Sequence, residues 1–393
     1  MSRMLALMAA LSTLAACGGS AGSDSPGTTG PSTTPVAQAA TLSGVVRRSG
    51  SSDVLGGATV SAGGRRVTSD SSGRYEITNI VAGNTTFQCV LVGYDTISFP
   101  VVLTAGANSR DCGLTQAEIL KVNSDAILVP RGSDPIRGVI VAMGGPVASG
   151  FVTGTVLVPE NPDLEGSQQS LGSDLRNLAR SLHVALLGMG STGLPNGGST
   201  DARVFDVLNT AAVLTHHPEL AAAPFVALGI SGGGPPAAGL VVRNSERAAG
   251  LVARVPDLLS VVSGPVLGVP SVVAQAGLDD QSVNATVKAI ADDNRSRGGL
   301  WALVVEPNRQ HMGSTLANNA AVITWIKEML SRRLPANVGD PLVALTDSSG
   351  WLGDPSTFNV SAWAAYAGDK RTASWLPSQA AATAWQGLAL GRP

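Results

Sequence analysis

The fold of this chain is indicated most clearly by the sequence Pro224-Phe225-Val226-Ala227-Leu228-Gly229-Ile230-Ser231-Gly232-Gly233. Its first five residues are an apolar run typical of a buried strand, and residues 235–242 behind it predict a helix. A serine at such a sharp turn is exposed, and it needs glycine neighbours because larger side chains would collide there. Residues 18–22 also read G-x-S-x-G, but neither a strand nor a helix adjoins them. The alternative interpretation of residues 229–233 is a glycine-rich turn in a Rossmann-like sheet.

Apolar strands and helical stretches alternate along residues 116–335. The expected strands are residues 126–129, 138–143, 184–187, 225–230, 271–276 and 301–305. The expected helices between them include residues 171–182, 202–214 and 283–295. Continuous apolar strands separated by helices predict an α/β fold, a mostly parallel sheet with helices on both faces.

An exposed serine needs a base, because a neutral hydroxyl is a poor nucleophile. The four histidines of the chain are His183, His216, His217 and His311. The first begins a strand, and the next two end a helix, where a capping or dipole role accounts for them. His311 lies in a loop between the strand 301–305 and a further helix, so we expect it to act as the base for Ser231.

The acidic partner of this histidine should lie between the serine and the histidine in chain order. Asp279 and Asp280 both follow the strand 271–276, and Asp257 follows an earlier strand. The residues alone leave these carboxylates open as candidates.

The order of strands, serine, acid and histidine resembles the α/β-hydrolase family over residues 116–335. In that family the acidic segment often reads Gly-x-x-Asp with an apolar residue three positions later. This pattern selects Asp280 and makes Asp279 a turn or capping residue. The resemblance implies an acyl-serine mechanism in which His311 takes the proton of Ser231 and Asp280 orients His311. It implies neither a cofactor nor a metal.

The oxyanion that develops in such a reaction needs backbone N–H donors. One donor is expected at Gly232, directly after the serine. The other is expected in Gly144-Gly145-Pro146, where the family commonly has His-Gly-Gly and this chain has Met143 in place of the histidine. Because a proline has no N–H, Gly145 is the better candidate.

The short intervals between Ser231, Asp280 and His311 leave no room for a large lid domain, which favours small or polymer-borne carboxylic esters. Two other functions stay open. One is a peptidase-like amide hydrolase with the same triad, ranked lower because no second domain with acidic residues for amine recognition is evident. The other is a non-catalytic lipoprotein that binds the cell envelope or a polysaccharide.

The N-terminus has the pattern of an export signal. Arg3 precedes an apolar stretch, and Leu14-Ala15-Ala16-Cys17 resembles the lipobox of bacterial lipoproteins, in which the cysteine becomes the lipidated N-terminus. We expect residues 1–16 to be removed, Cys17 to be lipidated, and residues 17–40 to form a flexible tether. The protein would then be anchored by lipid to a membrane of the cell envelope. The alternative is an ordinary signal peptide with a chance cysteine.

Residues 41–115 alternate between short β-branched strands and turns, which predicts a small β-sandwich. The sequence Thr68-Ser69-Asp70-Ser71-Ser72-Gly73-Arg74-Tyr75 resembles the signature of carboxypeptidase-regulatory-like (prealbumin-like) domains. This resemblance implies a spacer or adhesive module. Export would permit a disulfide between Cys89 and Cys112, while two buried free thiols are the alternative.

The C-terminal residues 336–393 carry four of the six tryptophans, Trp351, Trp363, Trp375 and Trp385. We expect them to pack this extension against the preceding domain; a sugar-stacking or substrate-contacting surface is the alternative.

Composition excludes several function classes. With 44% hydrophobic residues, the chain is not globally disordered. Its net charge of −2 lacks the excess of positive charge that is expected of a nucleic-acid binder. The longest apolar stretch, residues 4–16, is shorter than the roughly 20 residues of a membrane-spanning helix.

Overall fold

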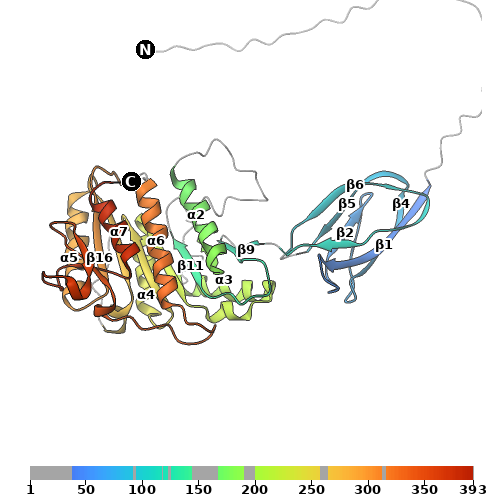
Figure 1. Ribbon diagram of the computed structural model, residues 1–393. Coiled ribbons are helices and arrows are strands. Elements are labelled where there is room, and N and C mark those ends of the chain that lie inside the picture. Colours follow the sequence, from blue (N-terminus) through green and yellow to red (C-terminus); the bar gives the residue numbers. More distant parts are fainter. Residues whose placement is uncertain are drawn as a thin grey trace, which may run out of the picture.

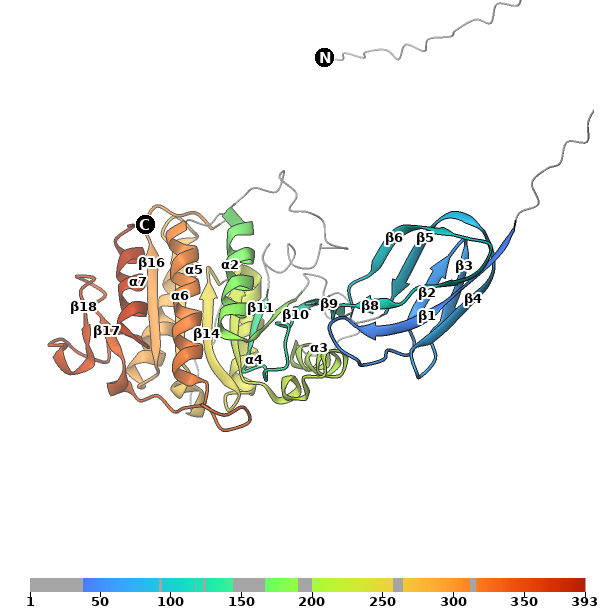
Figure 2. The same cartoon turned by 45° about the vertical axis from the view of Figure 1, so that its right-hand side comes forward.

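The computed structural model describes residues 38–91, 94–116, 118–122, 125–143, 167–189, 200–256, 264–311 and 316–392. Figures 1 and 2 show a β-rich module followed by a larger domain with a central sheet. Within the described ranges, no helix combines the length and the apolar character needed to cross a bilayer.

The N-terminal module consists of two sheets packed face to face. Its strands are β1 (Ala39–Arg48), β2 (Thr59–Ala62), β3 (Arg65–Thr68), β4 (Arg74–Val81), β5 (Gly83–Val90), β6 (Ile97–Leu103), β7 (Gly106–Ser109) and β8 (Cys112–Leu114). One sheet has the order β4-β1-β7 with β8 also paired to β1, and the other has the order β3-β2-β5-β6. Apolar side chains of both sheets, such as Ile77 and Phe87, form one core. The expected β-sandwich is confirmed.

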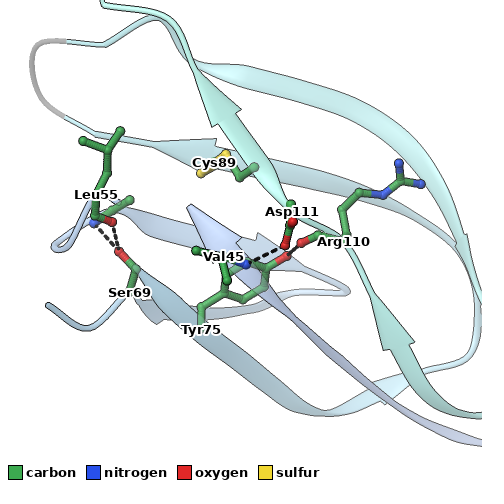
Figure 3. The surroundings of a disulfide bond; sticks show 9 residues. Val45, Leu55, Ser69, Tyr75, Cys89, Arg110 and Asp111 are labelled. Atoms are coloured by element: carbon green, nitrogen blue, oxygen red, sulfur yellow. Dashed lines mark hydrogen bonds between the residues drawn. A yellow bond between two sulfur atoms is a disulfide. The ribbon is translucent and has the colours of Figure 1, made fainter. Parts of the chain in front are cut away.

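A disulfide joins Cys89 of β5 to Cys112 of β8 and so connects the two sheets. Figure 3 shows its surroundings, where the hydroxyl of Tyr75 donates a hydrogen bond to the carbonyl oxygen of Arg110. Burial raises the pKa of Tyr75 to about 12. Of the two alternatives for the cysteines, the structure contains the disulfide.

The larger domain is built on an eight-stranded sheet. Its strands are β9 (Ile119–Val122), β10 (Asp125–Leu128), β11 (Val139–Met143), β12 (Ala185–Gly188), β13 (Phe225–Ile230), β14 (Ala248–Arg254), β15 (Ser271–Ala276) and β16 (Trp301–Glu306). The order across the sheet is β16-β15-β14-β13-β11-β12-β10-β9. The six strands from β11 to β16 all run parallel to one another. Strand β10 pairs antiparallel with both β12 and β9.

Helices cover both faces of this sheet, as expected. They are α2 (Ser167–Leu182), α3 (Thr200–Thr215), α4 (Gly234–Arg243), α5 (Gln281–Ser296), α6 (Leu316–Arg333) and α7 (Gln379–Ala389). One apolar core contains side chains of α3, α4 and α5, such as Leu240. The other contains side chains of α2, α6 and α7, such as Trp325. The predicted α/β architecture is therefore correct.

Two strands of the eight-stranded sheet, β9 and β14, are absent from the sequence prediction. Strand β9 is short, and the exposed Lys121 interrupts its apolar run. Strand β14 contains Gly250, a residue that disfavours strands. The structure explains this glycine, because a Cβ there would overlap the sulfur of Met329 on α6.

The C-terminal extension packs on the outer strand of the sheet. It forms β17 (Trp351–Gly353), β18 (Val360–Ala362), β19 (Ser374–Leu376) and helix α7. The hydroxyl of Ser374 accepts a hydrogen bond from the N–H of Leu303 at 3.2 Å, and Nε1 of Trp385 donates to the oxygen of Leu303 at 2.8 Å. The extension thus occupies polar groups that the edge strand β16 would otherwise expose.

The tryptophans of the extension differ in burial. Trp375 and Trp385 are each 1% exposed and act as packing anchors. Trp351 and Trp363 are half-buried, and Nζ of Lys370 lies 4.8 Å from the ring centre of Trp363.

Candidate active site

Ser231 occupies the turn between strand β13 and helix α4. Its φ of 51° lies in the left-handed region, which a residue with a side chain adopts only at a cost. A Cβ on Gly229 would lie 2.6 Å from the oxygen of Gly233. Likewise, a Cβ on Gly234 would lie 2.5 Å from the Cβ of Pro256. The predicted strand, turn and helix are present, and glycines make the turn possible.

His311 is the hydrogen-bonding partner of this serine. Nε2 of His311 lies 2.8 Å from Oγ of Ser231. The histidine follows strand β16, at the end of the sheet where β13 also ends, because the strands between them are all parallel. Its side chain is 30% exposed, so solvent reaches the imidazole.

Asp279 is the acidic partner of His311. Its Oδ2 lies 2.6 Å from Nδ1 of the imidazole, and its side chain is 13% exposed. When Nδ1–H donates to this carboxylate, Nε2 is left to accept the hydroxyl proton of Ser231. The prediction that Asp280 makes this contact is therefore wrong, and the neighbouring carboxylate does so instead.

Asp280 has a different structural role. It is the N-cap of helix α5, where its Oδ1 accepts hydrogen bonds from the N–H and the hydroxyl of Ser282 at 2.8 and 2.6 Å. These hydrogen bonds lower the pKa of Asp280, and the bond from the Ser282 hydroxyl has the largest effect. An aspartate directly before a helix is a strong capping signal in the sequence. Read in that way, the sequence would have left Asp279 as the acid.

The turn that carries Asp279 is fastened to the loop that carries His311. The N–H of Gly277 donates to the oxygen of Glu306 at 2.8 Å, and the N–H of Leu278 donates to the oxygen of Arg309 at 2.8 Å. These bonds continue the pairing of β15 with β16 beyond the ends of both strands. A Cβ on Gly277 would lie 2.9 Å from the oxygen of Glu306, so a glycine is required for this close approach.

The predicted oxyanion donors lie only partly within the described residues. Gly232 follows Ser231 in a short 3-10 turn, Ser231–Gly233, so its N–H is adjacent to the nucleophile. Gly145 lies outside the described residues. Strand β11 leads toward it and ends beside the serine turn, since Met143 is paired with Gly229.

Two of the remaining histidines, His183 and His217, have other partners. Nε2 of His183 lies 2.8 Å from the oxygen of Asp134, and Nδ1 of His217 lies 2.9 Å from Oε1 of Glu219. His216 lies directly after α3, with a φ of 59°. The other candidates, Cys17 and Asp257, fall outside the described residues.

The arrangement is suited to acyl transfer. A serine hydroxyl, an imidazole and a carboxylate form one hydrogen-bonded series, and a backbone N–H follows the serine. Such a series activates the hydroxyl as a nucleophile without a metal. Within the described residues, no group of three or more His, Cys, Asp and Glu side chains is placed to bind a metal ion.

Comparison with known proteins assigns the N-terminal module. Residues 41–111 match the model of the carboxypeptidase regulatory-like domain, as the sequence signature predicted. A similar solved structure is a putative carbohydrate binding protein from Bacteroides uniformis, at 12% identity and a TM-score of 0.18. The match covers 22% of this chain and 50% of that protein, so the chain spans about half of its length. No curated protein matches the chain.

Structures similar to the larger domain are α/β hydrolases. One is a putative α/β hydrolase from Agrobacterium tumefaciens, at 11% identity and a TM-score of 0.36, which covers 55% of this chain and 94% of that one. Another is an alpha-beta serine hydrolase homologue from Coxiella burnetii, at 14% identity and a TM-score of 0.29, with coverages of 55% and 94%. The fold assignment itself rests on the observed strand order and serine turn. The chain thus carries a carboxypeptidase regulatory-like domain at residues 41–111, followed by a domain with the α/β-hydrolase fold.

Proposed function

We propose that this protein is a serine hydrolase that cleaves carboxylic esters. The observation that carries the proposal is the hydrogen-bonded series from Ser231 through His311 to Asp279, which links the ends of three parallel strands. The strained backbone at Ser231 supports it, since such strain is concentrated at functional sites.

The reaction proceeds through an acyl-serine. His311 takes the proton as Oγ of Ser231 attacks the ester carbonyl, while the N–H of Gly232 stabilises the negative oxygen. The C–O bond to the alcohol breaks, and His311 gives the proton to the leaving alkoxide. A water molecule then attacks the acyl group by the same route and releases the carboxylic acid. Asp279 orients His311 throughout and stabilises the imidazolium.

Two measurements test this proposal. Purified wild-type protein should hydrolyse p-nitrophenyl acetate, and Ser231→Ala should lower kcat by roughly 10⁴-fold or more. A fluorophosphonate probe should label the wild type at Ser231 and leave the variant unlabelled. Equal hydrolysis by both proteins would refute the assignment, and folded wild type without label would favour a non-catalytic binding protein.

An amide hydrolase with the same triad is the second candidate. The sequence shows no evident second domain with acidic residues for amine recognition, which ranks this candidate below the esterase. Acyl esters and peptide anilides of the same acyl group, compared by kcat/KM, separate the two candidates.

We further propose that the protein is anchored to the cell envelope through a lipid on Cys17. The lipobox-like sequence Leu14-Ala15-Ala16-Cys17 supports this location. In a bacterial host, the wild type should partition into the detergent phase of a Triton X-114 extract and Cys17→Ser into the aqueous phase. A Cys89→Ser variant is the matched control, because it removes a cysteine and keeps the anchor.

A further inference from the structure

We propose that Arg309 is a positioning residue of this active site, a buried cation that holds the Asp279 turn against the His311 loop and offsets the charge of Asp279. The inference rests on the proposed function, since it concerns the same triad. Arg309 acts through Asp279 and through the backbone.

The main chain of Arg309 connects the two halves of the Asp279–His311 contact. Its carbonyl oxygen accepts the N–H of Leu278, the residue directly before Asp279. Along the chain, Arg309 lies two residues before His311. A displacement of Arg309 would therefore shift both the carboxylate and the imidazole, and a misplacement of about 1 Å can cost on the order of 10²-fold in rate.

Arg309 is buried, at 5% exposure, which is unusual for a charged residue. Its guanidinium lies 3.5 Å from Oε2 of Glu306, whose side chain is also buried. Burial lowers the pKa of Arg309, while the negative charges of Glu306 and Asp279 act in the opposite direction. Two carboxylates thus favour the buried cation, and one of them is the acid of the triad.

Glu306 is in turn tied to helix α6. Nδ2 of Asn318 donates to its Oε2 at 3.1 Å. Next along the helix, Oδ1 of Asn319 accepts a hydrogen bond from Nη1 of Arg254 at 3.2 Å. Burial and, next, the positive charge of Arg309 lower the pKa of Arg254 to about 9, while the negative charge of Glu306 acts in the opposite direction.

We refer to Arg254, Glu306, Arg309, Asn318 and Asn319 as the buried polar cluster. It spans the base of the His311 loop, since Glu306 precedes this loop and the two asparagines follow it. The cluster and Asp279 together carry two positive and two negative charges. Removal of the Arg309 charge leaves an excess negative charge, which favours protonation of the nearby imidazole and so removes the base. Removal of the Glu306 charge has the opposite effect.

This charge balance predicts pH profiles of opposite sign. In Arg309→Gln, kcat for p-nitrophenyl acetate should fall about 10- to 100-fold with a smaller change in KM. The midpoint of the acid limb of the pH–rate profile should rise by about one pH unit, because the substitution removes a neighbouring positive charge that water screens only in part. Arg309→Lys should restore the wild-type midpoint and part of kcat. In Glu306→Gln the midpoint should fall.

Arg333→Gln is the matched control. Arg333 is a buried arginine at the opposite end of α6, where its Nη2 donates to the oxygen of Ala248 at the start of β14. This variant should lower the thermal stability and leave the midpoint unchanged. Thermal unfolding shows which variants are folded. If Arg309→Gln does not fold, the midpoint of the acid limb in Glu306→Gln tests the positioning role, and an unchanged midpoint overturns it.

The outcomes separate the two proposals. An active wild type with unchanged midpoints in Arg309→Gln and Glu306→Gln would overturn the positioning role alone. A midpoint shift of equal size in Arg333→Gln would also overturn it. A folded wild type that neither turns over ester nor binds the fluorophosphonate probe would instead refute the proposed function.

Discussion

Asp279 and Asp280 are adjacent in the chain, yet only Asp279 reaches His311, with its Oδ2 2.6 Å from Nδ1 of the imidazole. The carboxylate of Asp280 faces the first turn of helix α5 and caps it. Two adjacent carboxylates therefore differ in role, since one is suited to catalysis and the other caps the start of a helix.

This difference predicts unequal effects of matched substitutions. Asp279→Asn should lower kcat for ester hydrolysis by about 10⁴-fold, because the imidazole loses the carboxylate that fixes its tautomer. Asp280→Asn should keep kcat near the wild-type value, since asparagine also caps helices well. Steady-state kinetics of both variants provide the measurement. A larger loss in Asp280→Asn would contradict the assignment.

The serine turn should not tolerate a side chain at Gly234. A Cβ there would lie 2.5 Å from the Cβ of Pro256, so Gly234→Ala should destabilise the larger domain by about 1–3 kcal/mol and disturb Ser231. Denaturant unfolding and ester turnover measure the two effects. Gly268→Ala is the control, because a Cβ at Gly268 has no heavy atom within 4 Å and should change neither quantity. Equal stability of the two variants would argue against the crowded turn.

Trp385 should be a major source of stability for the larger domain. It is 1% exposed and donates to the oxygen of Leu303, so Trp385→Ala should lower the free energy of unfolding by about 3–5 kcal/mol. Trp363→Ala, at a half-buried ring, should cost much less. Urea unfolding compares the two. Similar losses would show that the extension does not depend on the Trp385 anchor.

The β-sandwich should lose stability at high pH through Tyr75. Burial raises the pKa of Tyr75 from its ordinary value of 10.0 to about 12, so the folded state favours the neutral phenol. Its contribution to stability is therefore complete below pH 10 and is lost as the pH rises through 12. Thermal unfolding of the full chain should show a smaller decrease in stability over this pH range in Tyr75→Phe than in the wild type.

Tyr366 of the larger domain provides the comparison. Burial and Asp354 also raise the pKa of Tyr366 to about 12, so Tyr366→Phe tests the same effect outside the β-sandwich. Parallel curves for the wild type and Tyr75→Phe would contradict the prediction.

The sequence by itself determined the architecture and two members of the triad. Apolar runs separated by helical stretches indicate a sheet covered on both faces, because only buried strands are apolar along their whole length. Ser231 is identified by its glycine neighbours, and His311 by elimination among four histidines and by its position after a strand. These features depend on residues close together in the chain, so a single sequence is enough to predict them.

Tertiary structure decided what depends on distance between separate segments. The choice of Asp279 over Asp280 follows from backbone hydrogen bonds between the β15 and β16 loops, which turn one carboxylate toward His311 and leave the other on α5. The Cys89–Cys112 disulfide depends on the packing of two sheets. Burial of Arg309 with Glu306 depends on α6 lying against the ends of β14 and β16. A side chain's direction and its burial are set by the neighbours that surround it in space, and periodicity along the chain does not record them.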